Sequence, residues 1–181
     1  MPRQRVHKGD SHHEPMKPTK LSELIEALEF DSEERVTRVD LQNGCVVSVD
    51  QSLLGALEQG DDEALPDLPD WQKPELEIAR AIAEDSGERF LPAPDKFDFH
   101  EYRHMERFIA TVEDAGAAEQ LLRAIKGKGA FRYFKDTASR LGLLDQWFQY
   151  RDAAIREHIT DWAEANSVPY VDDLKDRKTE Q

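Results

Sequence analysis

The sequence predicts an α+β protein in which a small antiparallel β-hairpin or three-stranded sheet packs on a mostly helical C-terminal region. Two Val-rich runs, residues 35–41 and 45–50, flank an Asn-Gly pair. Asn-Gly between such runs is a strong hairpin signal, because a type I′ turn needs positive φ at both central residues. From residue 115 onward, apolar side chains recur at helical spacing and single glycines separate the segments. The length of 181 residues fits one domain.

The composition limits the expected binding partners and the expected cellular location of the protein. A formal net charge of −14 favours solubility and argues against nonspecific nucleic-acid binding by the whole surface. The single cysteine, Cys45, excludes an internal disulfide and a multi-cysteine zinc site, so a cytoplasmic location is expected. No apolar run is long enough for a transmembrane helix, and the N-terminus lacks an apolar export signal. We therefore expect no membrane partner.

The N-terminal part is expected to begin with a disordered tail followed by a short amphipathic helix. Residues 1–19 hold few apolar side chains and three Pro, so they cannot bury enough surface to offset the entropy of ordering. Thr19 is the expected cap of the helix that follows. The apolar side chains at helical spacing in that helix are Leu21, Leu24, Ile25 and Leu28.

Two more helices and a third strand are expected after the hairpin. Residues 51–59 favour a short helix, and residues 60–70 form an acidic loop that contains Pro. A helix covers residues 71–84, because Pro suits its first turn, and residues 89–92 are extended. Cys45 alternates with apolar neighbours on the second hairpin run and has no adjacent basic residue, which indicates a packed thiol.

Residues 100–104 read HEYRH and match the H-E-x-x-H pattern of zinc hydrolases. On one helix, His100 and His104 would ligate Zn²⁺ and Glu101 would act as general base. A competing interpretation, which we favour, assigns Glu101 to a capping box with Asp98 and leaves His100 in an exposed first turn. A third metal ligand would have to come from elsewhere, and the candidates are Glu119 and His158.

Three helices are expected at residues 115–126, 129–141 and 144–166. Short glycine turns join them, so they should pack as tight hairpins. The residues expected to face the core are Ala118, Leu121, Leu122, Ile125, Phe131, Phe134, Ala138, Leu141, Leu144, Phe148, Ile155, Ile159 and Trp162, with Trp147 at the edge.

The same helical region reverses the charge of the chain. Between Arg123 and Arg156 stand eight Lys or Arg and three Asp, a net charge of +5, whereas the remaining residues carry −19. Free N–H groups and the macrodipole at a helix start favour anions. The start of the helix expected at residues 129–141 is therefore a candidate anion site. The alternative is that the glycines form a tight turn and the cations pair with the protein's own carboxylates. The candidate residues are Lys126, Lys128, Gly129, Arg132 and Lys135, with Arg140, Arg151 and Arg156 widening the surface if the helices pack closely.

This region resembles an uncharacterised bacterial protein family, UPF0158. The resemblance rests on residues 123–135, RAIKGKGAFRYFK, and residues 142–151, GLLDQWFQYR, and it extends over residues 20–168. It implies a small, mostly helical α+β cytoplasmic protein and no established activity. In the family, the positions of residues 100–104 do not form a His-Glu-x-x-His motif. Further matching elements are Lys20-Leu21, Asp70-Trp71-Gln72-Lys73, Leu91-Pro92 and Met105-Glu106 with Phe108.

These observations favour a non-enzymatic binding or regulatory module whose partner is unknown. It would contact an anionic partner, nucleic acid or phosphate, through residues 127–135, GKGAFRYFK, and protein partners stay open. A phosphate-dependent enzyme is the alternative, and a metal-dependent hydrolase using His100 and His104 is a more distant one. The sequence contains no Walker lysine motif and indicates no cofactor. We expect residues 1–19 to be a tail, residues 20–168 one domain and residues 169–181 a polar C-terminal tail.

Overall fold

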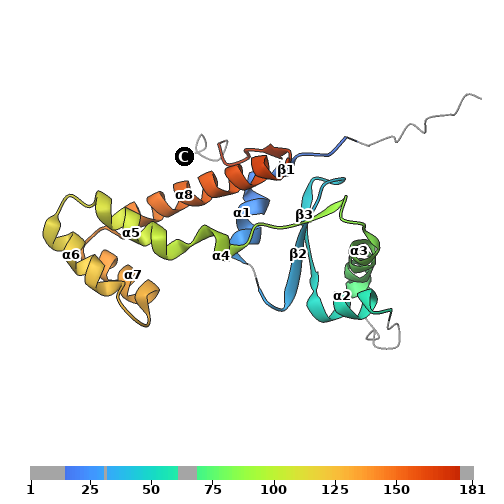
Figure 1. Ribbon diagram of the computed structural model, residues 1–181, viewed down its shortest axis with the longest axis horizontal. Helices are drawn as coiled ribbons and strands as arrows, with labels where there is room; N and C mark the ends of the chain where they lie inside the picture. Colours follow the sequence, from blue (N-terminus) through green and yellow to red (C-terminus); the bar gives the residue numbers. More distant parts are fainter. Residues whose placement is uncertain (1–14, 31, 61–68, 176–181) are drawn as a thin grey trace, which may run out of the picture.

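The computed structural model describes residues 15–30, 32–60 and 69–175, and it confirms the α+β class. The molecule is elongated, with helices at both ends and a small sheet between them (Figure 1). Most of the predicted N-terminal tail and most of the predicted acidic loop lie outside the described residues, so the division into domain and tails stays a prediction. Within the described residues, no helix combines the length and the apolar character needed to cross a bilayer.

The central sheet has three antiparallel strands in the order β3-β2-β4, so the predicted hairpin and third strand are confirmed. Strand β2 pairs with β3 along its whole length and with β4 through Arg38 to Asp40. Because β2 is the middle strand, Val39 lies fully buried beneath the packed helices. The strands are β2 (Arg35–Asp40), β3 (Cys45–Asp50) and β4 (Phe90–Pro92).

The hairpin turn differs from the predicted type I′ turn. Asp40 pairs with Cys45 across residues 41–44, and within this loop only Gly44 has positive φ, at 66°. The Asp40 carboxylate accepts hydrogen bonds from the backbone N–H groups of Gln42 and Asn43. These bonds stabilise a four-residue loop in place of the two-residue turn. A Cβ at Gly44 would lie 2.7 Å from the Pro18 carbonyl oxygen, so close backbone approach as well as φ requires glycine there.

The first and last described segments of the chain pair with each other. Strand β1 (Thr19–Lys20) runs parallel to β5 (Tyr170–Val171), and the Thr19 N–H donates to the Pro169 carbonyl at 2.9 Å. Thr19 is buried in this strand and makes no capping hydrogen bond to helix α1 (Leu21–Glu29). The predicted Thr19 cap is therefore wrong, because long-range pairing takes its place.

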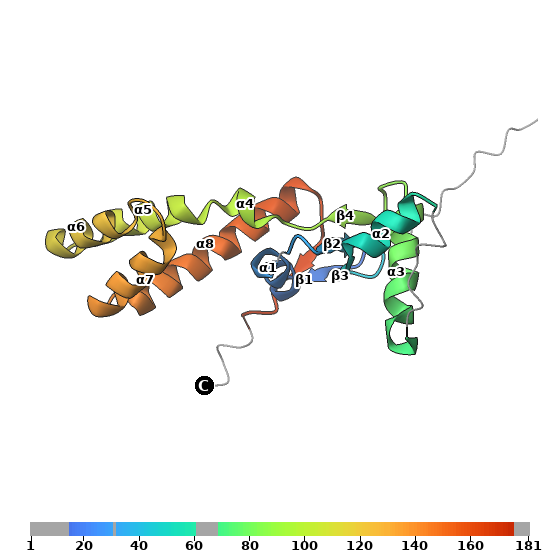
Figure 2. The same cartoon turned by 90° about the horizontal axis from the view of Figure 1, so that it is seen from below.

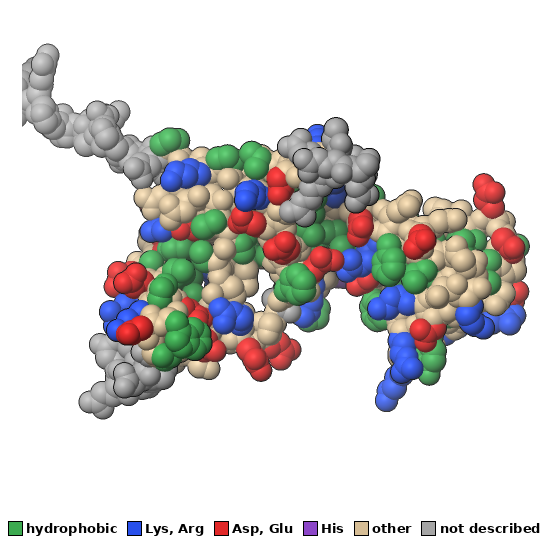
Figure 3. Space-filling view, turned by 180° about the vertical axis from the view of Figure 1, so that it is seen from behind, with side chains coloured by type: hydrophobic (Ala, Val, Ile, Leu, Met, Phe, Trp, Pro, Cys, Tyr) green, Lys and Arg blue, Asp and Glu red, His purple; other side chains and the backbone are tan. Residues whose placement is uncertain are grey.

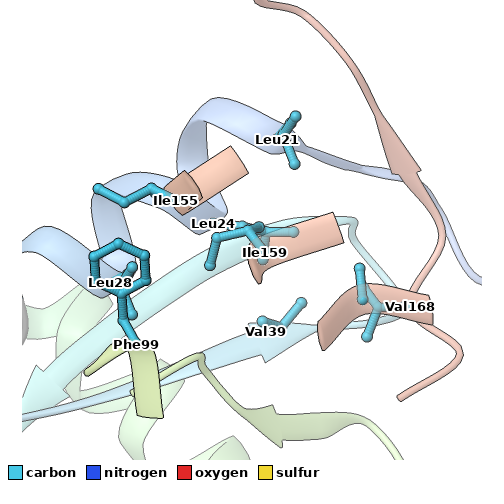
Figure 4. Close-up of a cluster of buried hydrophobic side chains, with 9 residues drawn as sticks. Leu21, Leu24, Leu28, Val39, Phe99, Ile155, Ile159 and Val168 are labelled. Atoms are coloured by element: carbon cyan, nitrogen blue, oxygen red, sulfur yellow. The ribbon is translucent and has the colours of Figure 1, made fainter. Parts of the chain in front are cut away.

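Helix α1 and the second half of helix α8 (Leu144–Ala165) pack on the sheet and form the central core (Figure 4). A second core lies at one end of the sheet, under α2 (Gln51–Glu58) and α3 (Lys73–Glu84). Asp50 starts α2 by accepting from the N–H groups of Ser52 and Leu53. The central core contains Leu21, Leu24, Leu28, Val39, Phe99, Ile155, Ile159, Ala163 and Val168.

A helical arm, defined here as residues 101–151, extends from the other end of the molecule. It contains α5 (Glu101–Thr111), α6 (Ala115–Ala124), α7 (Ala130–Arg140) and the first half of α8. Short helix α4 (Lys96–Phe99) leads into it, and α8 runs from the arm back into the body (Figure 2). We use "body" for the described residues outside the arm. The arm has its own core around Trp147, whose ring centroid lies 4.9 Å from Phe134 and 5.5 Å from Phe108.

Three predicted core positions in the arm are wrong. Phe131 and Phe148 are 49% and 43% exposed, Leu122 is also exposed, and Trp147, expected at the edge, is 1% exposed. The buried side of α8 repeats every four residues as Trp147, Arg151, Ile155, Ile159 and Ala163. Arg151 interrupts the apolar spacing of this line, which is why the sequence pattern favoured the neighbouring face.

Candidate anion-binding surface

The turn between α6 and α7 places a helix start at the protein surface. Gly127 and Gly129 both have positive φ, at 89° and 78°, and Gly129 directly precedes α7. A Cβ at Gly129 would lie 3.0 Å from the Tyr133 ring, so the ring rests against the glycine. The start of α7 has no side-chain cap and no acidic residue in its first turn. Its first N–H groups therefore lack an intrahelical or side-chain acceptor.

The four predicted cations of this turn, named here the basic surface, are Lys126, Lys128, Arg132 and Lys135, and all four are exposed. Arg132 Nε lies 3.8 Å from Asp136 Oδ2, and both side chains are mostly in solvent, so this ion pair stabilises little. The three lysine side chains form no ion pair or hydrogen bond with any described residue. Figure 3 shows Lys and Arg side chains along the edge of the arm, beside hydrophobic ones.

The more distant arginines do not widen this surface in the predicted way. Arg151 donates through Nε to Glu101 at 2.7 Å and through Nη1 to Glu29 at 2.8 Å. Arg156 is paired with Asp172. These two arginines therefore bind carboxylates of neighbouring elements. Arg140 is exposed at the far end of α7 from the turn and donates to the Thr137 hydroxyl at 3.3 Å.

Exposed aromatic rings stand among the cations, although the helical spacing predicted core positions for Phe131 and Phe148. Tyr133 is 57% exposed, and Phe131 and Phe148 are about half exposed. Phe131 and Phe148 line a pocket of about 310 Å³ between α5, α7 and α8, named here the aromatic pocket. The remaining lining residues are Glu101, Met105, Phe134, Lys135, Trp147 and Arg151. Lys135 thus belongs to both the basic surface and the pocket.

The family model of an uncharacterised protein family, UPF0158, matches residues 15–179. The chain belongs to this family. A UPF0158 protein of Pseudomonas aeruginosa is 29% identical over 96 residues, which cover 52% of this chain and 61% of that relative. The match thus spans less than two thirds of the relative's length. No solved structure matches the chain.

In this UPF0158 protein, the H-E-x-x-H residues do not form the helical arrangement of a zinc hydrolase. His100 lies between α4 and α5 in the left-handed conformation, with φ of 50°, so His100 and His104 do not share one helix. The predicted capping box is also wrong: Glu101 binds Arg151, and no side chain caps the start of α5. Both interpretations fail because the left-handed backbone at His100 ends α4 and places Asp98 and His104 on different helices.

The structure brings His104 and His158 together instead. His104 stacks on Phe99 with centroids 4.3 Å apart, and His158 meets the same ring edge-on at 5.6 Å. Burial lowers the pKa of His104, and the positive charges of Arg107 and His158 lower it further. His100 lines the same depression, but among the described residues no three His, Cys, Asp or Glu side chains are grouped to hold a metal ion. Glu119 pairs with Arg123 at 2.5 Å.

Cys45 is a half-buried free thiol on β3, as predicted. Burial raises its pKa, and the negative charges of Asp40 and Glu23 raise it further. A thiol with a raised pKa is a poor nucleophile at neutral pH, because the thiolate is the reactive form. The half-buried position and the raised pKa favour a structural thiol over a nucleophile.

Proposed function

We propose that this protein is a binding module that holds a single-stranded nucleic acid on the basic surface of its arm. One observation carries the proposal: three exposed lysines without a carboxylate partner among the described residues stand beside exposed aromatic rings on the same turn and helix. Lysines held by counterions alone release them when phosphates bind, and exposed rings stack on unpaired bases.

The unpaired lysines are informative because the chain contains 38 Asp and Glu against 24 Lys and Arg. Carboxylates are therefore plentiful, and three arginines of the body, Arg35, Arg89 and Arg156, do bind them. Lys126 and Lys128 instead remain in solvent just before α7, and Lys135 remains in solvent in its second turn. The uncapped N–H groups at the start of α7 add a partial positive charge for a phosphate.

The aromatic rings favour a single strand over a duplex. In a duplex the base faces are stacked on one another, so rings such as Phe131 and Tyr133 have no base face to meet. The charge distribution also favours binding on the arm, which holds nine Lys or Arg and seven Asp or Glu, a net charge of +2. The remaining chain carries −16 and would repel the phosphates of a strand that left the arm.

The test is the binding of labelled single-stranded RNA and DNA, followed by fluorescence anisotropy over a salt series. The arm variant is Lys126→Gln/Lys128→Gln/Lys135→Gln. The control, Lys17→Gln/Lys20→Gln/Lys73→Gln, changes the net charge equally at exposed lysines of the body. We expect wild-type affinity to fall with salt, with a log–log slope of about −0.7 for each phosphate contacted.

We expect the arm variant to lose most of the affinity and most of the salt dependence, and the body variant to keep both. Two results would contradict the proposal. One is the absence of binding to either strand at low salt, and the other is an equal loss in the two variants, which would show only a general charge effect.

A further inference from the structure

We infer that the aromatic pocket between α5, α7 and α8 receives one unstacked nucleobase of the strand whose phosphates lie on the basic surface. This inference rests on the proposed function and assigns a second, apolar part to the same site. It predicts that bases, and not only phosphates, contribute to the affinity.

The shape and lining of the pocket suit a flat ring. Phe131 from α7 and Phe148 from α8 are half exposed at its edge, while the buried Phe134 and Trp147 lie deeper. Two large aromatic side chains left in solvent beside one pocket expose apolar surface that a ligand would cover. The volume of about 310 Å³ is at the small end for ligand pockets, which suits one ring system.

The polar groups of the pocket match the edge of a base. Arg151 uses Nε and Nη1 for its two carboxylates, and its Nη2 makes no hydrogen bond with a described residue. This fixed guanidinium can donate to a base carbonyl, while the Glu101 carboxylate can accept from an exocyclic amino group. Lys135 lines the pocket and also belongs to the basic surface, so a base in the pocket leaves its own phosphate near a free cation.

An acidic peptide with an apolar anchor is the competing occupant. A helix that docks in a groove presents anchors over two turns and needs a longer apolar trough than this pocket provides. The Glu101 carboxylate in the pocket lining would also repel an acidic side chain. The observations therefore favour a base.

The test compares two strands with the same phosphate backbone, one carrying all its bases and one with abasic positions. The pocket variant is Phe131→Ala/Phe148→Ala, with Phe131→Leu/Phe148→Leu as a milder form that keeps apolar volume but removes the rings. The control is Phe97→Ala, an exposed ring on α4 outside the pocket. Circular dichroism establishes that each variant is folded.

We expect the wild-type protein to bind the intact strand at least about fivefold more tightly than the abasic strand. Both pocket variants should lose this preference and keep the salt dependence, and the Phe97 variant should keep both. Equal binding of the two strands by wild-type protein, with affinity still lost in the lysine variant, would overturn the inference and leave the proposed function standing.

Three further outcomes would overturn the inference. A preference for the intact strand that survives in both pocket variants would place the stacked base elsewhere, for example on Tyr133. Binding of neither strand would remove the proposed function and the inference together. Binding of an acidic, Phe-containing peptide by a protein that binds no strand would assign the pocket to a protein partner.

Discussion

Three arginine side chains of the body, Arg35, Arg89 and Arg156, pair with carboxylates, whereas the lysine side chains of the basic surface on the arm pair with none among the described residues. Arg89 donates to both carboxylate oxygens of the buried Asp40, at 3.0 and 2.7 Å. Arg35 reaches Glu75 at 3.0 Å. The contrast shows two uses of positive charge in one chain. Cations that pair with carboxylates stabilise the fold, whereas cations surrounded by solvent alone are available to bind a partner.

The difference follows from where each charge lies. Burial by itself would raise the pKa of Asp40, but hydrogen bonds from Arg89 and Asn43 lower it below its ordinary value. Removing Arg89 would leave this carboxylate buried and without its cation, which is costly. Removing an exposed lysine costs little folding stability, because water already hydrates its ammonium group.

The largest expected effect is that of Arg89→Leu. Asp40 is nearly inaccessible, while the Arg89 side chain is 37% exposed, so we expect a loss of about 2–3 kcal/mol in the free energy of unfolding. Urea unfolding measures the loss. The matched change on the arm, Lys128→Leu, should stay within about 0.5 kcal/mol of wild type. Equal losses in the two variants would erase the contrast between body and arm.

A smaller effect is expected for Arg151→Gln, where the arm joins the body. Arg151 links Glu29 of α1 to Glu101 of α5, and all three side chains are partly in solvent. We expect a loss of about 1–2 kcal/mol, measured by urea unfolding, with faster hydrogen exchange at the start of α5. Lys135→Gln, which changes a cation of the same pocket, is the control and should leave both readouts near wild type.

These differences also show what sequence reasoning can reach. The hairpin, the third strand and the glycine-separated helices follow from local patterns, and the structure confirms them. The buried face of α8 does not, because its middle position is Arg151, whose carboxylate partners come from elements 50 and 122 residues away. The exposure of Phe148 follows from the same error.

The candidate site was predicted in part. The four cations and the glycine turn were identified by spacing, and the structure places all of them at the surface of one turn and helix. The aromatic pocket was not predicted, because Phe131 stands at core spacing and its exposure depends on how α7 packs against α5 and α8. The pairing of Thr19 with Tyr170 is likewise long-range and leaves no local signal.

A pH dependence should arise at the body–arm junction, where His104 packs on Phe99. The pKa of His104 is lowered in the folded state, so the unfolded chain takes up a proton first as the pH falls through the ordinary value of 6.5. Folding stability should therefore decrease as the pH falls from 6.5 toward the lower folded-state pKa. Urea unfolding at several pH values measures this decrease.

The variant His104→Asn should flatten that pH dependence, because it removes the titrating ring. His100→Asn is the control, since His100 is exposed and Asn tolerates its left-handed backbone. An unchanged pH slope in the His104 variant would assign the dependence to other groups.

The smallest expected effect on stability is that of Lys126→Gln/Lys128→Gln/Lys135→Gln. These lysines form no ion pair with a described residue, so the free energy of unfolding should change by no more than about 0.5 kcal/mol in urea unfolding. A loss comparable to that of Arg89→Leu would mean that the arm lysines also serve the fold.

The most direct test of the contrast is a map of amide chemical shifts in the isotope-labelled protein as a short single-stranded oligonucleotide is added. The oligonucleotide should bind where the cations have no carboxylate partner. We therefore predict that the shifted amides cluster at residues 126–135 and around Phe148. The amides of β2, β3, α2 and α3 should stay in place. Shifts centred on the body, or no shifts at all, would contradict the assignment of the arm's basic surface to nucleic-acid binding.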